Sequence, residues 1–202
     1  MTDLAAPPAP VKLTTTSPAR PSRLQHTFRR ARKLTVTFLA IVGFITLARP
    51  FTFDLTPMIS PSMSPAITGD GPGGDWVFAE KVSYYFRNPR RYDIVEFNNG
   101  EGLQLMKRVI ALPGETVAIQ HNALVVNGNQ LPPAAGAAPV KYYPYGNLAA
   151  GRTHTVAGGY YVLGDNSADS DDSRYNGPVT GNAIKARAWL IVWPPSRIGW
   201  VH

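Results

Sequence analysis

The apolar residues of this chain form one long run near the N-terminus and many short runs after it. The long run, residues 34–48, holds fifteen residues without a charge. Short apolar runs bounded by Gly, Pro, Asn and Asp are typical of β-strands. The sequence predicts seven of them, at residues 76–82, 93–97, 103–112, 116–119, 123–126, 160–163 and 186–193.

No run after residue 57 has helical spacing longer than two turns. Asn127-Gly128 follows one predicted strand directly, and this pair is typical of the type I′ turn of a hairpin. We therefore expect a mainly β, antiparallel, curled or barrel-like domain over residues 54–202. Residues 132–158 are rich in Pro, Ala, Gly and Tyr, and they predict an irregular insertion without a strand.

The long apolar run would cover about 22 Å as a helix, less than the ~30 Å hydrocarbon core of a bilayer. It fits a buried helix, a cleavable signal peptide, or a membrane anchor that continues through Phe51 and Phe53 while Arg49 reaches toward the interface. The basic cluster just before the run, residues 29–33, favours the anchor, so we expect one transmembrane helix over residues 34–53. The positive-inside rule then places residues 1–33 in the cytoplasm and the β domain on the extracytoplasmic side.

Composition and charge exclude several classes of function. With 202 residues, 44% of them hydrophobic, the chain can bury a core, and the lack of cysteine excludes disulfide scaffolds, thiol nucleophiles and thiolate metal sites. Residues 1–33 carry seven basic groups against Asp3 and show no apolar periodicity, which predicts a disordered basic tail. Since the tail holds +6 of the net charge of +7, the folded part is nearly neutral, and we expect no nucleic-acid partner.

Two segments place reactive side chains in unusual surroundings. In Ser60-Pro61-Ser62 a serine lies on a proline-restricted, non-helical backbone, although a Ser/Pro linker has the same composition. Strand alternation puts Lys107 on the same face as the aliphatic Leu105, Val109 and Ala111. Such a lysine either extends into solvent, the usual outcome, or is kept neutral by burial and acts as a general base. The second outcome costs about 1.4 kcal/mol for each pKa unit lost.

A third segment, residues 164–174, combines four carboxylates with four small hydrogen-bonding side chains. A calcium loop of the EF-hand type needs Gly at its sixth position and Glu at its twelfth, where this chain has Ser170 and Asn176, so we expect no metal site. A surface loop remains the plain alternative. The sequence shows no G-x-S-x-G motif and no histidine in a distinctive context, so a Ser–Lys pair is a better candidate than a Ser–His–Asp triad.

Taken in order, these segments resemble the type I signal peptidases, membrane-bound serine proteases that remove signal peptides from exported proteins. The resemblance covers about residues 34–200. It is carried by the apolar run, then Ser62-Met63-Ser64-Pro65, then Lys107-Arg108-Val109-Ile110-Ala111-Leu112-Pro113-Gly114, then Gly164-Asp165-Asn166 followed by Ser170-Asp171-Asp172-Ser173-Arg174. The three polar blocks in this order behind an anchor are highly specific.

The resemblance implies a role for each matching residue. Ser62 would be the nucleophile, Lys107 its general base, and Ser60 a hydroxyl that joins the Ser62 N–H in an oxyanion hole. Ser170 would hold the lysine amine in position. Supporting residues would be Gly164, Asp165, Asn166, Asp172 and Arg174, and Met63 and Met106 would contribute to a shallow substrate pocket.

This chain departs from the family pattern at three places. Ala66 stands where a threonine is usual, residues 70–75 form a longer Gly-rich version of a Gly-Asp pair, and Ser167 replaces a basic residue. None of these changes removes a reacting group.

The implied substrates are signal peptides of exported preproteins with small residues at the first and third positions before the cut, and no cofactor is implied. Two alternatives stay open: a catalytically silent, membrane-tethered β module that binds exported proteins, and a self-cleaving Ser–Lys protease of the repressor type. The second would carry an N-terminal DNA-binding domain, which the tail and apolar run do not resemble.

Overall fold

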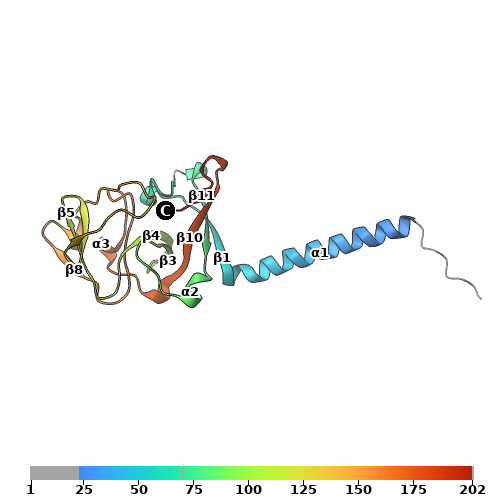
Figure 1. Ribbon diagram of the computed structural model, residues 1–202, viewed down its shortest axis with the longest axis horizontal. Coiled ribbons are helices and arrows are strands. Elements are labelled where there is room, and N and C mark those ends of the chain that lie inside the picture. The colour runs from blue at the N-terminus through green and yellow to red at the C-terminus, as the bar shows by residue number, and fades with distance from the viewer. Residues whose placement is uncertain (1–22, 70, 202) are drawn as a thin grey trace, which may run out of the picture. The chain divides into compact units, whose positions relative to one another are not determined.

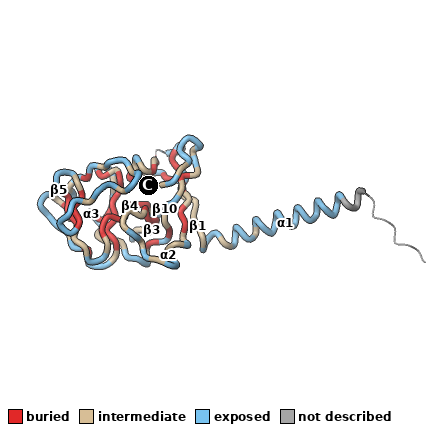
Figure 2. The backbone as a smooth tube through the Cα atoms, viewed as in Figure 1, coloured by how far each residue is buried: buried red, intermediate tan, exposed pale blue. Residues whose placement is uncertain are grey.

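The computed structural model describes residues 23–69 and 71–201; most of the predicted tail (1–22) and Asp70 lie outside the described residues. The chain divides into two compact units, residues 1–45 and 46–202. Buried residues of the described chain are found in the second unit (Figure 2).

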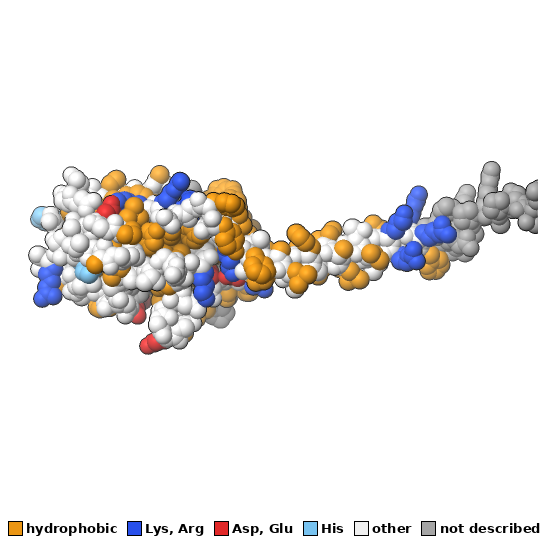
Figure 3. Space-filling model, turned by 90° about the horizontal axis from the view of Figure 1, so that it is seen from below, with side chains coloured by type: hydrophobic (Ala, Val, Ile, Leu, Met, Phe, Trp, Pro, Cys, Tyr) orange, Lys and Arg blue, Asp and Glu red, His pale blue; other side chains and the backbone are white. Residues whose placement is uncertain are grey.

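A single long helix, α1, runs from Arg23 to Thr52 and ends at the start of the first strand. It begins eleven residues before the predicted anchor, so residues 23–33 are helical where the sequence predicts a disordered tail. The physical reason is that Leu, Gln, Arg, Lys and Ala are good helix formers and that no Gly or Pro interrupts this stretch. Figure 3 shows basic side chains near the start of the helix and apolar ones along the rest.

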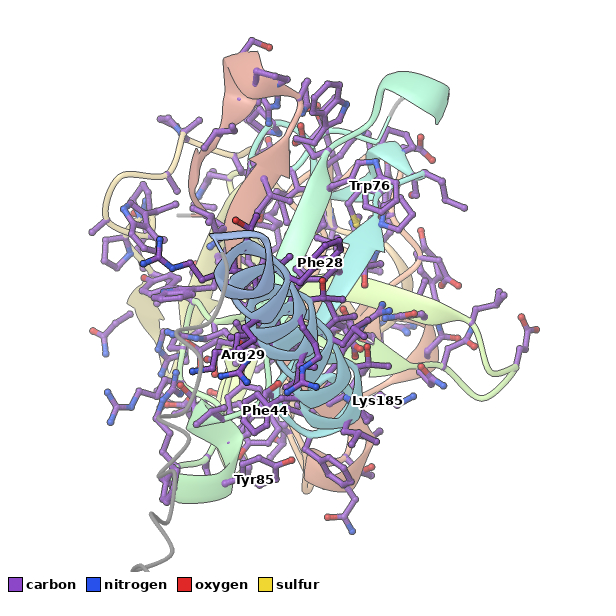
Figure 4. The ribbon with its side chains drawn as sticks, turned by 90° about the vertical axis from the view of Figure 1, so that its right-hand side faces the viewer. Phe28, Arg29, Phe44, Trp76, Tyr85 and Lys185 are labelled. Atoms are coloured by element: carbon purple, nitrogen blue, oxygen red, sulfur yellow. The ribbon has the colours of Figure 1, made fainter. Side chains whose placement is uncertain are left out.

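The part of α1 from Thr27 to Thr52 has a mean hydropathy of 1.8 over its most apolar stretch and is long enough to cross a membrane. Its 26 residues correspond to about 39 Å of helix. Because the basic residues before the apolar run are helical as well, the helix is longer than the run alone would form. Phe28, Arg29 and Phe44 are labelled on it in Figure 4.

The second unit is built from antiparallel strands in two sheets (Figure 1). The larger sheet has the order β1-β2-β10-β3-β4-β9, with β11 paired to β10, and the smaller has the order β7-β6-β5-β8. The strands are β1 (Phe53–Pro57), β2 (Trp76–Glu80), β3 (Ile94–Asn98), β4 (Gln104–Ala111), β5 (Thr116–Gln120), β6 (Ala123–Val126), β7 (Asn129–Gln130), β8 (Thr153–Thr155), β9 (Tyr161–Leu163), β10 (Ile184–Trp193) and β11 (Gly199–Trp200).

The prediction of a mainly antiparallel β fold is confirmed, and each of the seven predicted strands is present with its ends shifted by at most two residues. The larger sheet does not close into a barrel, since β1 and β9 end its strand order among the described residues. Helical segments after α1 are one turn long, namely α2 (Ser83–Phe86) and α3 (Ser173–Asn176), with the 3-10 turns η1 (Pro61–Met63), η2 (Gly71–Gly73), η3 (Gly146–Leu148), η4 (Gly181–Ala183) and η5 (Pro195–Arg197).

Two sequence expectations need correction. The segment 132–158 contains the strand β8, which pairs with β5; its three residues are too short to show an alternation of apolar and polar positions. In β4 the register shifts between Val109 and Ala111, so that Ile110 and Ala111 both pack in one core cluster. Because such an irregularity interrupts the two-residue repeat, Ala111 leaves the face that Leu105 and Val109 share.

Three apolar clusters hold the second unit together. One joins the smaller sheet to β4 and β9, and another lies against the opposite face of β3, β4 and β9. The third joins strands β2, β3, β4 and β10 of the larger sheet to the segment after β1 and comprises Met58, Met63, Ile67, Val77, Ala79, Ile94, Met106, Ala186 and Ala188. This third cluster, called the inner core below, lies directly beneath the segment that carries Ser62.

Candidate active site

Ser62 lies in the 3-10 turn η1, between the end of β1 and the chain segment that leads to β2. Pro61 occupies the first position of this turn, where a fixed φ is favourable and no N–H is needed. Ser60 precedes the turn, and its side chain accepts a hydrogen bond from the backbone N–H of Ser62 at 3.3 Å. The turn is buried against the inner core through Met63, so the backbone that carries Ser62 is held firmly.

The side chain of Lys107 reaches Ser62 from β4. Its Nζ lies 2.7 Å from Ser62 Oγ and donates a hydrogen bond to it. Both residues are buried, with 5% of Ser62 and 2% of Lys107 exposed. Residues 45 positions apart in the sequence therefore place an amine and a hydroxyl in direct contact, away from water.

The surroundings of Lys107 favour its neutral form. Burial is the main cause that lowers its pKa below the usual range, and the nearby Arg174 acts in the same direction. The carboxylates of Asp172, Asp171 and Asp165 oppose this, because a negative charge stabilises the protonated amine. None of the ion pairs between described residues includes Lys107, so no carboxylate holds its charge directly.

The third block of the sequence supports both reacting residues. The backbone N–H of Asn166 donates to the carbonyl of Ser62 at 2.9 Å. Gly164 lies so close that a Cβ there would overlap the Ser62 carbonyl and the Ser170 hydroxyl. The block therefore packs directly against the backbone of Ser62, and only glycine fits at position 164.

Asp172 is the centre of this block. Its carboxylate accepts hydrogen bonds from the Gly164 N–H at 3.1 Å and from the Ser170 hydroxyl at 2.8 Å. It also pairs with Arg174 through Nε at 2.9 Å and Nη2 at 2.8 Å, and both side chains are fully buried. The pair fixes the loop because neither charge can reach water.

The structure thus brings together Ser60, Ser62, Lys107, Gly164, Asn166, Ser170, Asp172 and Arg174. The hydroxyl of Ser170 donates to Asp172, and no hydrogen bond between described side chains joins it to Lys107. Met63 and Met106 are buried in the inner core beside the site. The roles assigned to Ser170 and to these methionines stay predictions.

Sequence reasoning missed two partners of the supporting residues. Asp165 forms a buried, bidentate ion pair with Arg108, with Nε–Oδ1 at 2.8 Å and Nη2–Oδ2 at 2.6 Å. Ser167 accepts hydrogen bonds from Arg174 Nη1 at 2.8 Å and from the backbone N–H of Tyr143 at 2.9 Å. The sequence does indicate that Arg108 points to the face of the strand opposite Lys107, because the two residues are neighbours on that strand.

The irregular segment 132–158 also borders the site. A hollow of about 190 Å³ lies between Pro65 and Ala66, just after the nucleophile turn, and Gly136, Ala137, Ala138 and Val140, with Asp165 beside them. Tyr143, in the same segment, contacts Ser167 and Arg174 through its backbone. The segment is thus part of the wall around the third block.

No group of three or more His, Asp or Glu side chains among the described residues could hold a metal ion. The site offers an amine, the hydroxyls of Ser60, Ser62 and Ser170, and backbone N–H groups. An amine that loses its proton beside a hydroxyl can activate that hydroxyl as a nucleophile.

Comparisons with known proteins agree on one family. A family model described as "Signal peptidase, peptidase S26" matches residues 31–193. A probable signal peptidase I-2 of Synechocystis sp. is 33% identical over 191 residues, which cover 91% of this chain and 82% of the relative. A signal peptidase I of Leptolyngbya laminosa is 34% identical over 160 residues, 75% of this chain and 74% of the relative. The crystal structure of a signal peptidase I from Enterococcus faecalis, 32% identical, has a TM-score of 0.41 and covers 50% of this chain and 97% of its own.

Proposed function

Because this chain belongs to the signal peptidase family of S26 peptidases, we propose that Ser62 and Lys107 are the nucleophile and general base with which it cuts. The chain is a serine endopeptidase that removes signal peptides, as its relatives are named for doing. The observation that carries the residue assignment is the 2.7 Å contact between Lys107 Nζ and Ser62 Oγ, with both groups buried.

The reaction follows from the two groups in contact. Neutral Lys107 takes the proton of the Ser62 hydroxyl while Oγ bonds to the carbonyl carbon of the scissile peptide, and the carbonyl electrons move onto its oxygen. When this tetrahedral intermediate collapses, the C–N bond breaks and the lysine gives its proton to the leaving amine. Water then loses a proton to Lys107 and attacks the acyl ester, and the lysine returns that proton to Oγ.

The oxyanion of the intermediate would be held at the start of η1. The Ser62 N–H and the Ser60 hydroxyl lie side by side there, joined by a long hydrogen bond of 3.3 Å. In the reaction both would turn toward the substrate oxygen, for which they are the nearest pair of donors on this turn. The removal of one such donor typically costs a factor of about 10² to 10³ in rate.

Ser170 would orient the lysine. Its hydroxyl donates to Asp172, which leaves its oxygen lone pairs free to accept from the amine. Asp172, Arg174, Gly164, Asp165 and Asn166 would keep this arrangement rigid without taking part in the chemistry.

The larger sheet offers an edge for an extended substrate. Residues 104–107 of β4 pair with β3 on one side, whereas β9 pairs with β4 only from Arg108 onward. β1 has β2 as its neighbour, and the side chains of Thr56 and Gln104 are in hydrogen-bond contact at 3.3 Å, which brings β1 close to β4. A peptide added as a strand between these two edges would present its backbone to Ser62.

We also propose that α1 anchors the chain in a membrane, with residues 1–33 in the cytoplasm, residues 34–53 in the span and the catalytic domain of residues 54–202 outside. The basic residues before the apolar stretch support this orientation. A tethered enzyme meets a membrane-bound substrate at high effective concentration, so modest affinity suffices.

Aromatic side chains on the second unit support contact with lipid. Phe53 of β1 stacks on Phe78 of β2 at 5.0 Å, and Trp189 packs against Phe78 at 6.3 Å and Trp200 at 4.8 Å. Four tryptophans are exposed on β2, β10 and β11, namely Trp76, Trp189, Trp193 and Trp200; Trp76 is labelled in Figure 4. Because β1 directly follows α1 and tryptophan favours the membrane–water interface, we propose that this face rests there.

A cleavage assay with the full-length protein in detergent tests the proposal. We expect Ser62→Ala and Lys107→Ala each to abolish cleavage of a preprotein with Ala at the first and third positions before the cut, with the circular dichroism spectrum unchanged. The matched controls are Ser196→Ala and Lys185→Ala, which alter exposed residues of the same types and should leave cleavage intact. Near-full activity of Lys107→Ala would refute the base assignment, and activity of Ser62→Ala would refute the nucleophile.

A further inference from the structure

A buried carboxylate that the mechanism does not use lies on β3 near the proposed substrate edge. Glu96 is fully buried. Its Oε2 accepts a hydrogen bond from Thr56 Oγ1 of β1 at 3.1 Å, and its Oε1 accepts one from Gln104 Nε2 of β4. Burial raises its pKa, since the charged form loses its contact with water. Because burying a carboxylate costs free energy, we expect Glu96 to have a functional role.

The position of these side chains is set by the strand register. Glu96 is paired with Met106, so the two side chains lie on the same face of the sheet. Gln104 is two residues from Met106 on β4, and therefore points to that face as well. The face is otherwise apolar, because Met106 belongs to the inner core. Glu96, Gln104 and Thr56 together form a polar patch at the end of that core.

The patch is accessible to a bound peptide through its outer members. Gln104 is exposed and Thr56 is partly exposed, whereas Glu96 lies beneath them. Gln104 Nε2 donates to both Glu96 and Thr56, so Gln104 Oε1, which accepts no hydrogen bond from another described side chain, is the acceptor that remains for a peptide.

A substrate strand beside β4 would meet this patch at a defined position. Alternate residues of a strand point to the same face and lie about 6.6 Å apart. If the residue before the cut lies over Met63 and Met106, next to Ser62, the residue two positions earlier lies opposite Gln104. That is the third residue before the cut.

We propose that Glu96, Gln104 and Thr56 determine specificity at the third position before the cut, where they favour a small side chain with a hydroxyl group, serine or threonine. This rests on the proposed function and narrows its substrate class. The hydroxyl donates to Gln104 Oε1, because both N–H groups of this amide are donated to Glu96 and Thr56, and the buried Glu96 holds the amide in that orientation. An apolar side chain of the same size removes these polar groups from water and offers them no hydrogen bond in exchange.

Two peptides that differ only by threonine or valine at this position test the proposal, because these side chains have nearly the same shape. The ratio of kcat/KM for the threonine peptide to that for the valine peptide is measured with the full-length protein in detergent. We expect a ratio of about five for the unaltered protein, the value of a hydrogen bond between neutral groups. The ratio should fall to about one in the double variant Thr56→Val/Gln104→Leu and in Glu96→Leu.

The control is Gln120→Leu, which changes an exposed glutamine of β5 in the smaller sheet and should leave the ratio at about five. The double variant alters only exposed or partly exposed side chains, so it keeps the test valid if Glu96→Leu does not fold. Equal cleavage of both peptides by the unaltered protein, with loss of activity in Ser62→Ala, would overturn this inference and leave the proposed function standing. Cleavage of neither peptide, or of no preprotein, would refute both.

Discussion

The ion pair of Asp172 and Arg174 gives the sharpest test of how the site is held. In the variant Asp172→Asn the carboxylate loses its charge but keeps its shape. Arg174 then remains fully buried, with the carbonyls of Tyr143 and Ser170 and the hydroxyl of Ser167 as its other acceptors. A guanidinium without a counter-ion in such a place is the main cost of the substitution.

The structure gives the size of the effect. Loss of one partner of a buried ion pair costs about 3–5 kcal/mol, and for a chain of this length each kcal/mol lowers the midpoint of thermal unfolding by about 2–4 °C. We therefore expect a decrease of about 6–20 °C. Activity should fall as well, because Asp172 holds both the Gly164 N–H and the Ser170 hydroxyl next to Ser62.

The assay is thermal unfolding of the full-length protein in detergent, followed by near-ultraviolet circular dichroism, with peptide cleavage measured alongside. The control is Asp54→Asn, which breaks the partly exposed pair with Lys81 and should cost less than about 1 kcal/mol. The double variant Asp172→Asn/Arg174→Gln should lose less than the sum of the two single losses, since no charge is left unpaired. A midpoint for Asp172→Asn within 2 °C of the unaltered protein would refute the view that this pair holds the loop.

Three further predictions follow from the same geometry. Because burial lowers the pKa of Lys107 and only the neutral amine accepts a proton, kcat/KM should fall as the pH drops through that lowered pKa, below the range of a free lysine; a profile that stays flat down to pH 5 would contradict this. Gly164→Ala should reduce peptide cleavage by about two orders of magnitude, since its Cβ would displace Ser170 or the Ser62 backbone, whereas Gly100→Ala, in open space, should behave as the unaltered protein; equal activity of both would count against the packing argument. In lipid nanodiscs, brominated lipids should quench the fluorescence of the exposed tryptophans, and an unquenched spectrum would argue against contact of the aromatic face with the bilayer.

Much of the fold could be predicted from local patterns. Strands such as β6, bounded by turn residues and followed by Asn127-Gly128, were located within two residues because alternation and turn chemistry act over short distances. The strands β1, β7, β8 and β11 were not found. β1 follows α1 without a turn residue between them, so its start at Phe53 was assigned to the membrane span, and the other three are only two or three residues long and carry no pattern of their own. They exist because a neighbouring strand supplies their hydrogen bonds, which is a property of the tertiary structure.

The reacting residues were predictable and their environment was not. Ser62 and Lys107 stand in distinctive segments, and the family resemblance linked them before their contact was seen. The pair of Arg108 with Asp165 joins β4 to a distant loop, and no spacing in the sequence indicates which carboxylate a given arginine meets. The same holds for Glu96, which looks like an ordinary polar position of a strand until β1 and β4 enclose it.

The nucleophile, the base and the loop that supports them come from three stretches that are widely separated along the chain. Nothing short of complete tertiary packing joins them, so a newly made or partly denatured molecule has an ordinary charged lysine and an inert serine. Proteolytic power is therefore acquired only in the last stage of folding, which protects neighbouring polypeptides until the enzyme is finished. The rate of peptide cleavage therefore reports whether the tertiary structure is intact. In a denaturant titration, the loss of activity should coincide with the loss of the near-ultraviolet circular dichroism signal.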